Sequence, residues 1–165
     1  KDYDVVTDAV PEQVTHCFRR TLQIGAQFGV VMVLVDGEQV EVATFRTEGG
    51  YQDGRHPGHV EFASATEDAS RRDFTVNGMF FDPIEETVLD FVNGQRDLEK
   101  CILKTIGNPD ERFDEDFLSL LRAVRFAVML DFRIEPVTWA AILALAGLMI
   151  WVSAYRIAVV LEKIL

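Results

Sequence analysis

The spacing of hydrophobic and polar positions differs between the two parts of the chain. Up to about residue 108, short apolar runs are separated by turn residues, a pattern typical of strands that alternate with short helices. Residues 30–46 hold Asp36-Gly37 between two β-rich segments and therefore predict a hairpin, and residues 79–91 predict a second hairpin. The other elements expected here are a strand at 2–8, a helix from Pro11 to about Ile24, a turn-rich loop at 47–62 and a short helix at 94–100.

From Pro109 onward the pattern becomes helical. Residues 117–128 repeat apolar side chains at the i, i+3, i+4 and i+7 positions, which predicts an amphipathic helix whose apolar stripe faces the core. This stripe comprises Phe117, Leu120, Leu121, Val124 and Val128. The opposite half, a face that is most often merely solvated, would comprise Glu115, Asp116, Ser119, Arg122 and Arg125. Further helices are expected near 136–146 and 153–165, so the sequence predicts an α+β part, 1–108, followed by an all-α part, 109–165.

The longest apolar run, residues 139–152, is too short to span a membrane. A spanning helix needs about 20 apolar residues, whereas this run is interrupted by Gly147, so we expect a buried helix and no membrane partner. The last predicted helix carries an apolar stripe at helical spacing, which we expect to be exposed and to drive self-association. Its members are Ile157, Val160, Leu161 and Ile164.

Composition and charge narrow the class of protein. With 48% hydrophobic and 26% charged residues among 165, the chain has the composition of an ordinary globular protein. The formal net charge of −11 argues against binding a nucleic-acid backbone by overall charge, so such a partner would require a local cluster of cations or a metal. Cys17 and Cys101 lie far apart and near no paired histidines, which favours a reducing cytoplasm over a disulfide framework or a zinc site.

Two stretches carry candidate chemistry in the first part. Asp2 and Asp4 are two residues apart on a predicted strand, so their side chains share one face and could hold Mg²⁺. Glu41 lies in a β-rich run that could neighbour this strand and add a third carboxylate, as two-metal phosphoryl transfer requires. A strand edge with exposed acids is the alternative interpretation of Asp2-x-Asp4 alone.

The second stretch is Ser70–Gly78, SRRDFTVNG. Arg71, Arg72, Asp73 and Asn77 could be a solvated loop in which Asp73 caps a short helix. Guanidinium groups also make forked contacts with phosphate, and a neighbouring carboxylate suits a ribose hydroxyl. Both interpretations stay open from the residues alone.

Five motifs, taken together, resemble one family. They are KDYDVVTDAVPEQV, EVATFR, RRDFTVNGMFFDP, DFVNGQRDL and RFDEDFLSLLRAVRF, and their order and spacing are similar to those of class II tRNA nucleotidyltransferases and bacterial poly(A) polymerases over nearly the whole chain. The resemblance implies a mixed-sheet nucleotidyltransferase head with flanking helices, followed by helices of the neck. It also implies transfer of AMP or CMP from ATP or CTP to the 3′ end of tRNA or another RNA, with release of pyrophosphate.

The resemblance assigns roles to individual residues. Asp2 and Asp4 would be the catalytic carboxylates that bind Mg²⁺, and Glu41 would be a third catalytic acid. Asp90, Gly94 and Asp97 in DFVNGQRD would belong to a flexible element between head and neck.

Nucleotide-binding roles follow for six further side chains. Arg72 and Asp73 would contact the ribose, and Asn77 would reach toward phosphate. Asp116 would contact the base of the incoming nucleotide, and Arg122 and Arg125 would hold base or phosphates.

The sequence departs from the family pattern in four respects. The glycine-rich GG-x-x-R-D turn would precede Lys1 and the helical body and tail would follow Leu165, so residues 1–165 alone are expected to be nearly inactive. Gly78 stands where alanine is commoner in the family. Ser119 stands where the family usually has an arginine that partners the base-reading aspartate, so we expect a less sharp choice between ATP and CTP, or a choice through another residue.

Two alternatives to RNA nucleotidyl transfer remain at this point. A catalytically silent nucleotide-binding or interaction module is favoured by Ser119 and disfavoured by Asp2-x-Asp4. A nucleotidyltransferase acting on a small hydroxylated molecule would share the two acids but not the RRDFTVN and RAVRF motifs. The motifs do not distinguish addition of CCA, CC, A or poly(A).

Overall fold

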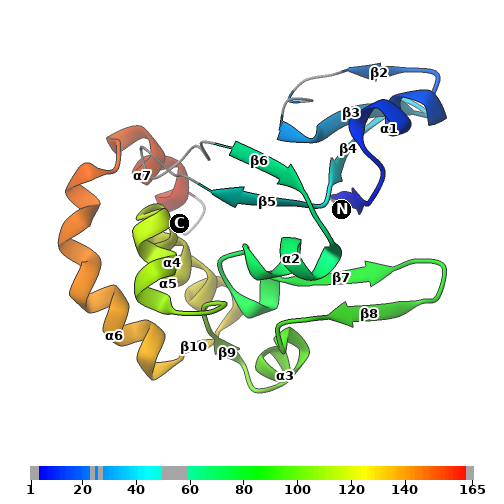
Figure 1. Ribbon diagram of the computed structural model, residues 1–165. Coiled ribbons are helices and arrows are strands. Elements are labelled where there is room, and N and C mark those ends of the chain that lie inside the picture. Colours follow the sequence, from blue (N-terminus) through cyan, green and yellow to red (C-terminus); the bar gives the residue numbers. More distant parts are fainter. Residues whose placement is uncertain (1–3, 23–24, 26–27, 50–58, 163–165) are drawn as a thin grey trace. The chain divides into compact units, whose positions relative to one another are not determined.

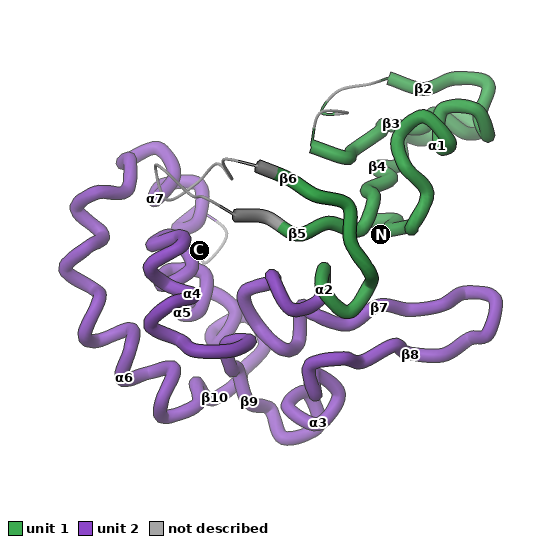
Figure 2. Tube along the Cα trace, in the orientation of Figure 1, with its two compact units in different colours: residues 1–50, 57–68 green, residues 51–56, 69–165 purple. Residues whose placement is uncertain are grey.

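The computed structural model describes residues 4–22, 25, 28–49 and 59–162 (Figure 1). The chain divides into two compact units, residues 1–50 with 57–68 and residues 51–56 with 69–165 (Figure 2). The α+β class predicted from the sequence is confirmed by this mixture of strands and helices and by its similarity to known structures given below.

The first unit contains a four-stranded mixed sheet with the strand order β1-β4-β3-β2. The strands are β1 (Val5–Thr7), β2 (Thr21–Leu22), β3 (Val30–Val35) and β4 (Glu38–Thr44). β1 runs parallel to β4, whereas β3 is antiparallel to both of its neighbours. Asp36 and Gly37 join β3 to β4 with φ angles of 51° and 89°, so the predicted Asp-Gly hairpin is confirmed.

The core of this unit lies between the sheet and α1 (Pro11–Cys17). Val31 and Val33 alternate with more exposed residues along β3, and they pack with Val42 of β4 and Val14 of α1. One face of the sheet is therefore buried by the helix, as the period-two pattern requires.

The helix predicted from Pro11 to about Ile24 is shorter than expected. It ends at Cys17, and Thr21–Leu22 form an edge strand that pairs with β3, with Thr21 opposite Val33. The backbone of Leu34 also donates a hydrogen bond to the carbonyl of Arg20. These residues therefore satisfy their backbone groups on the free edge of β3 instead of in a further helical turn.

The region expected to be a loop at 47–62 is bounded by strands. β5 (Arg46–Gly49) and β6 (His59–Phe62) pair antiparallel, with Arg46 opposite Phe62, so the expectation of a loop is wrong at both ends. α2 (Ala65–Ser70) follows β6.

The second unit begins with short elements. A 3-10 turn, η2 (Thr75–Asn77), precedes the antiparallel hairpin of β7 (Met79–Asp82) and β8 (Thr87–Asp90), which was predicted. The short helix predicted at 94–100 is α3 (Gly94–Glu99). β9 (Ile102–Leu103) then pairs in parallel with β10 (Arg133–Ile134).

Helices form the rest of this unit. They are α4 (Pro109–Glu115), α5 (Leu118–Leu130), α6 (Pro136–Leu145), the 3-10 helix η3 (Ala146–Trp151) and α7 (Ala154–Leu161). Their buried core centres on the aromatic side chains of Phe74 and Phe113, together with Leu103, Leu120, Ala123, Ala141 and Ile142. Among the described residues, no helix is long and apolar enough to cross a membrane.

The orientation of α5 differs from the prediction. Ser119, expected on the polar face, is only 6% exposed, whereas Val128, expected in the core, is 61% exposed. Leu120 and Ala123 lie against the core that contains Phe74 and Phe113, so the buried stripe is rotated about the helix axis relative to the predicted one.

The apolar stripe of α7 also differs from the expectation of an exposed surface. Val160 is only 5% exposed and Ile157 is half-buried, whereas Leu161 is 43% exposed and Ile164 lies outside the described residues. α7 packs against α5, which covers this part of the stripe. Other large apolar side chains of the second unit are also exposed: Val128, Val137, Leu143, Ile150, Trp151 and Tyr155.

Candidate functional site

The acidic candidates lie on neighbouring strands of the first unit. Val5 is the parallel partner of Val42, so Asp4 and Glu41, each one residue earlier, extend the same register and share one face. Val42 is buried on the α1 side, so the face that carries the two acids is the opposite one, and both acids are exposed. The prediction that Glu41 neighbours the first strand is therefore confirmed.

Asp2, the other acid of the Asp2-x-Asp4 pair, lies outside the described residues. Among those that are described, no group of three or more potential ligands is close enough to hold a metal ion. Adjacent strands are about 4.8 Å apart, so Asp4 and Glu41 together present hard oxygen donors of the kind that Mg²⁺ prefers.

In the second unit, Asp73 organises the polar residues of the RRDFTVN motif. Its Oδ1 accepts hydrogen bonds from the backbone N–H of Phe74 at 3.0 Å and from Asn77 Nδ2 at 3.3 Å. Its Oδ2 lies 2.8 Å from Nη2 of Arg122 on α5. The structure therefore brings together Asp73, Asn77 and Arg122, which are up to 49 positions apart in the sequence.

Arg122 and Arg125 share the aromatic ring of Phe126. The guanidinium carbon of Arg125 lies 4.6 Å from the ring centroid and that of Arg122 lies 5.7 Å from it. Phe126 in turn packs edge-on against the buried Phe74, with centroids 5.8 Å apart. Partial burial lowers the pKa of Arg125, and repulsion from Arg122 lowers it further, while Asp73 acts in the opposite direction.

The polar atoms of this cluster are not all satisfied by the protein. Within the described part of the chain, Arg122 Nε and Arg125 Nε are buried and have no hydrogen-bond partner, whereas Asp73 Oδ2 is engaged in the ion pair with Arg122. Leaving a buried polar group unpaired costs about 1–3 kcal/mol. Two buried N–H donors without a partner in the protein are a feature of a site that is completed by a ligand.

Arg72 lies beside this cluster on the same motif. Its Nη1 donates a hydrogen bond to the carbonyl of Asn77 at 3.1 Å, and its guanidinium carbon lies 4.7 Å from the centroid of the Phe80 ring. Arg72 therefore stabilises the turn that contains Asp73 and Asn77.

The role of Arg112 was not recognised from the sequence. Its Nη1 donates to the carbonyl of Arg71 at 2.9 Å and contacts Glu115 Oε2 at 2.7 Å, and its Nη2 donates to the carbonyl of Ser70. α4 thereby holds the backbone that precedes Asp73. The only signal of Arg112 in the sequence was its place in the RFDEDF motif.

Asp116 is held by an arginine that sequence reasoning missed. Arg156 Nη2, on α7, lies 3.1 Å from both carboxylate oxygens of Asp116, and Asp116 Oδ1 also accepts a hydrogen bond from the backbone of Leu118. Ser119 is buried, and its backbone N–H donates to the carbonyl of Asp116. The guanidinium partner of Asp116 therefore comes from 40 positions away and not from position 119.

The DFVNGQRD segment is tied by hydrogen bonds. Asp90 accepts from the backbone N–H groups of Val92, Gly94 and Gln95 at 2.9–3.1 Å. Burial acts to raise the pKa of Asp90, but these N–H groups outweigh it and bring the pKa below its ordinary value. A Cβ atom at Gly94 would lie only 2.3 Å from the carbonyl oxygen of Thr75, so glycine is required here. The predicted flexibility of this segment stays a prediction.

Comparison with known proteins identifies the family. Residues 1–104 match the family described as the poly A polymerase head domain, and the chain belongs to that family. It is 46% identical over 165 residues to a CCA-adding enzyme of Pediococcus pentosaceus and 42% identical to one of Bacillus subtilis, in each case over 99% of this chain. The chain covers 41% of the length of both relatives.

A solved structure shows the same fold. The crystal structure of Bacillus stearothermophilus CCA-adding enzyme in complex with CTP matches with a TM-score of 0.88 and 36% sequence identity. The match covers 99% of this chain and 39% of that chain.

Proposed function

We propose that this chain is the nucleotide-handling part of a template-independent RNA nucleotidyltransferase, which transfers AMP or CMP from ATP or CTP to the 3′ end of tRNA and releases pyrophosphate. The observation that carries the proposal is the cluster of Asp73, Arg122 and Arg125, whose two unpaired N–H donors lie within a member of this family. The relatives' name, CCA-adding enzyme, and the CTP in the similar crystal structure support it.

The cluster suits a nucleoside triphosphate. Arg122 and Arg125 offer N–H donors and positive charge, which match phosphate oxygens or the acceptor edge of a base. Asp73 offers an acceptor for a ribose hydroxyl, and its contacts with Asn77 and Arg122 fix its orientation before the ligand arrives. A preorganised site of this kind loses less side-chain entropy on binding. The ribose and phosphate roles of Arg72 and Asn77 remain part of the proposal.

Asp4 and Glu41, together with Asp2, would hold Mg²⁺. The exposed, adjacent carboxylates of Asp4 and Glu41 fit a hard divalent cation by the chemistry of their oxygens. When bound, such ions stabilise the charge that develops on the attacking and leaving oxygens of an in-line displacement. The carboxylates would hold the ions on the exposed face of the sheet, and Glu41 would orient the attacking 3′ hydroxyl group from the neighbouring strand β4. No covalent enzyme intermediate is required.

Three further points belong to this proposal. The product would be a CCA end, in keeping with the relatives' name, although the motifs are shared with poly(A) polymerases. The head would end near residue 108, between the end of the family match at residue 104 and the start of α4 at Pro109. The compartment would be the cytoplasm, in keeping with the two exposed free cysteines, Cys17 and Cys101.

Nucleotide binding to this chain tests the proposal without requiring catalysis. Calorimetric titration with CTP and with ATP in the presence of Mg²⁺ should show binding that weakens about 10-fold or more in Arg125→Gln, because a charge-assisted contact to the ligand is lost. Arg133→Gln is the matched control, since Arg133 is exposed on β10 and belongs to no part of the cluster. Equal affinity of Arg125→Gln and the unsubstituted chain would contradict the assignment of the cluster.

A further inference from the structure

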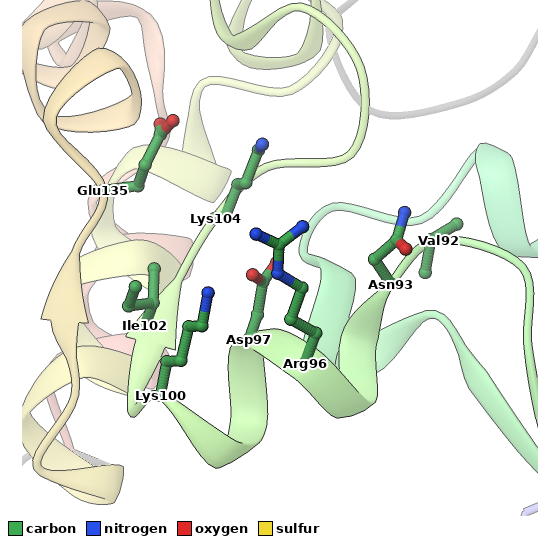
Figure 3. A pocket seen from close by; sticks show the side chains of 8 residues that line it. All are labelled: Val92, Asn93, Arg96, Asp97, Lys100, Ile102, Lys104 and Glu135. Atoms are coloured by element: carbon green, nitrogen blue, oxygen red, sulfur yellow. The ribbon is translucent and has the colours of Figure 1, made fainter.

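A second cationic site lies in the second unit, apart from the cluster of Asp73, Arg122 and Arg125. A cavity of about 260 Å³ is lined by Val92, Asn93, Arg96, Asp97, Lys100, Ile102, Lys104 and Glu135 (Figure 3). Arg96 projects from α3, Lys100 from the residue that caps the end of this helix, and Lys104 from the segment that follows β9. Arg96 and Lys100 are four residues apart and therefore lie on one side of the helix. Three cations in one cavity are unusual for a chain whose formal net charge is −11.

The two carboxylates of the cavity are already engaged within the protein. Asp97 Oδ2 accepts a hydrogen bond from Thr75 Oγ1 at 2.8 Å. Glu135 Oε2 accepts from both the backbone N–H and the Oγ1 of Thr138 at 3.0 Å, at the start of α6. By contrast, no ion pair within the described ranges includes Arg96, Lys100 or Lys104. The positive charge of the cavity is therefore available to a ligand.

The walls of the cavity are fixed by Thr75, which is buried. The Thr75 side chain donates to Asp97 on α3, and its backbone N–H donates to the carbonyl of Lys104 at 2.9 Å. Asp90 additionally binds the backbone N–H groups at the start of α3. The bases of all three cationic side chains are thus held in one arrangement before any ligand binds, which reduces the entropy lost on binding.

The lining indicates which part of a nucleic acid fits. Among the described residues, the lining contains no aromatic side chain on which a base could stack, and base recognition in single-stranded RNA depends largely on such stacking. Lysine is a flexible point charge that suits phosphate oxygens, and Asn93 can contact a sugar or phosphate oxygen. Three cations against two carboxylates leave one net positive charge, which matches a single phosphodiester better than a free triphosphate.

We propose that this cavity binds a backbone phosphodiester of the RNA acceptor through Arg96, Lys100 and Lys104. The choice of RNA as the partner rests on the proposed function, whereas the cationic cavity does not. The contact would position the strand without reading its sequence. It would also explain how a strongly acidic chain can contribute to RNA binding, since only local charge is required.

The test is equilibrium binding of a fluorescently labelled single-stranded RNA to the chain, followed by anisotropy at several salt concentrations. EDTA is present and nucleotide is absent, so that binding is separated from transfer and failure of the proposed function leaves this measurement intact. The test variant is Lys100→Gln/Lys104→Gln. The matched control is Arg19→Gln/Arg20→Gln, which removes the same charge from two exposed positions outside the cavity.

We expect Kd to rise about 10-fold for the test variant at low salt, and the slope of log K against log salt to fall by about 1.4, or about 0.7 for each lost phosphate contact. The control should change both quantities much less, and urea unfolding should show that both variants fold. Equal effects in the two variants, or RNA binding too weak to measure in the unsubstituted chain, would overturn the proposal. A titration with inorganic phosphate is the third arm: stabilisation by phosphate that depends on both lysines, with unchanged RNA binding, would assign a free-anion site and overturn the RNA assignment.

Discussion

The ion pair between Asp116 and Arg156 should be a measurable link between the start of α5 and α7. The perturbation is Arg156→Gln, which keeps much of the side-chain length and removes the charge. Arg156 Nη2 contacts both carboxylate oxygens of Asp116 at 3.1 Å. Because Asp116 also binds the Leu118 backbone, the loss of Arg156 should loosen the start of α5 as well.

The expected magnitude follows from the partial burial of the pair. The Arg156 side chain is 21% exposed and that of Asp116 is 30% exposed, so the pair lies between two known limits. Exposed pairs contribute about 0–1 kcal/mol, whereas breaking a fully buried pair costs about 3–5 kcal/mol. A contact with both oxygens at intermediate burial should give a coupling free energy of about 1 kcal/mol, equivalent to a Tm change of about 2–4 °C in a chain of this size.

The assay is a double-mutant cycle with Arg156→Gln, Asp116→Asn and the double variant, each unfolded in urea. The coupling is the departure from additivity of the changes in the free energy of unfolding. Arg133→Gln provides a control for removal of an exposed arginine in the same unit. A coupling free energy below about 0.3 kcal/mol would refute the reasoning, because residues that do not interact are additive to that level.

Three further predictions concern single residues of the second unit. Ser119→Arg should lower the free energy of unfolding by about 1–3 kcal/mol, because Ser119 is buried and Asp116 already has a guanidinium partner. If Asp116 reads the base, the ratio of kcat/KM for ATP to that for CTP should change as well. An unchanged ratio together with unchanged stability would exclude both effects. Gly78→Ala should lower the free energy of unfolding, measured by thermal unfolding, by about 1 kcal/mol, because the added Cβ would lie 2.8 Å from Val92 Cγ2 and 2.9 Å from Ile106 Cδ1. A stabilised variant would show that these two side chains move aside without cost. Because the pKa of Asp90 is lowered in the folded chain, its contribution to stability is fully present above the ordinary carboxyl pKa and is lost as the pH falls through the lowered pKa. The free energy of unfolding, measured from pH 6 to pH 2, should therefore fall less steeply for Asp90→Asn than for the unsubstituted chain.

Features determined by local sequence were predicted correctly. The hairpin at Asp36-Gly37 depends on two residues that adopt positive φ, and the hairpin at 79–91 depends on alternating apolar residues around a turn. The adjacency of Glu41 to the first strand was inferred from a single β-rich run and is confirmed by the parallel pairing of β1 and β4.

Features determined by contacts between distant parts of the chain were not predicted from the sequence. Thr21–Leu22 form a strand because β3 offers a free edge, which no pattern within residues 11–24 reveals. The buried side of α5 is decided by Phe74 and Phe113, so periodicity gave the helix but not its rotation. Similarly, nothing near Asp116 in the sequence indicates Arg156, because their contact depends on how α7 packs against α5.

The most direct test of the central claim is nucleotide addition by this chain placed in a longer relative. Residues 1–165 would replace the matching segment of the Bacillus subtilis CCA-adding enzyme, to which they are 42% identical, and the chimera would be assayed for extension of a tRNA lacking its 3′ end. We predict that the chimera adds nucleotides from CTP and ATP and releases pyrophosphate. We also predict that Asp4→Ala lowers the rate by about 10³-fold, because the stabilisation lost with a carboxylate that holds Mg²⁺ is several kcal/mol. An inactive chimera that is folded by circular dichroism, or an Asp4→Ala chimera with a near-normal rate, would contradict the claim.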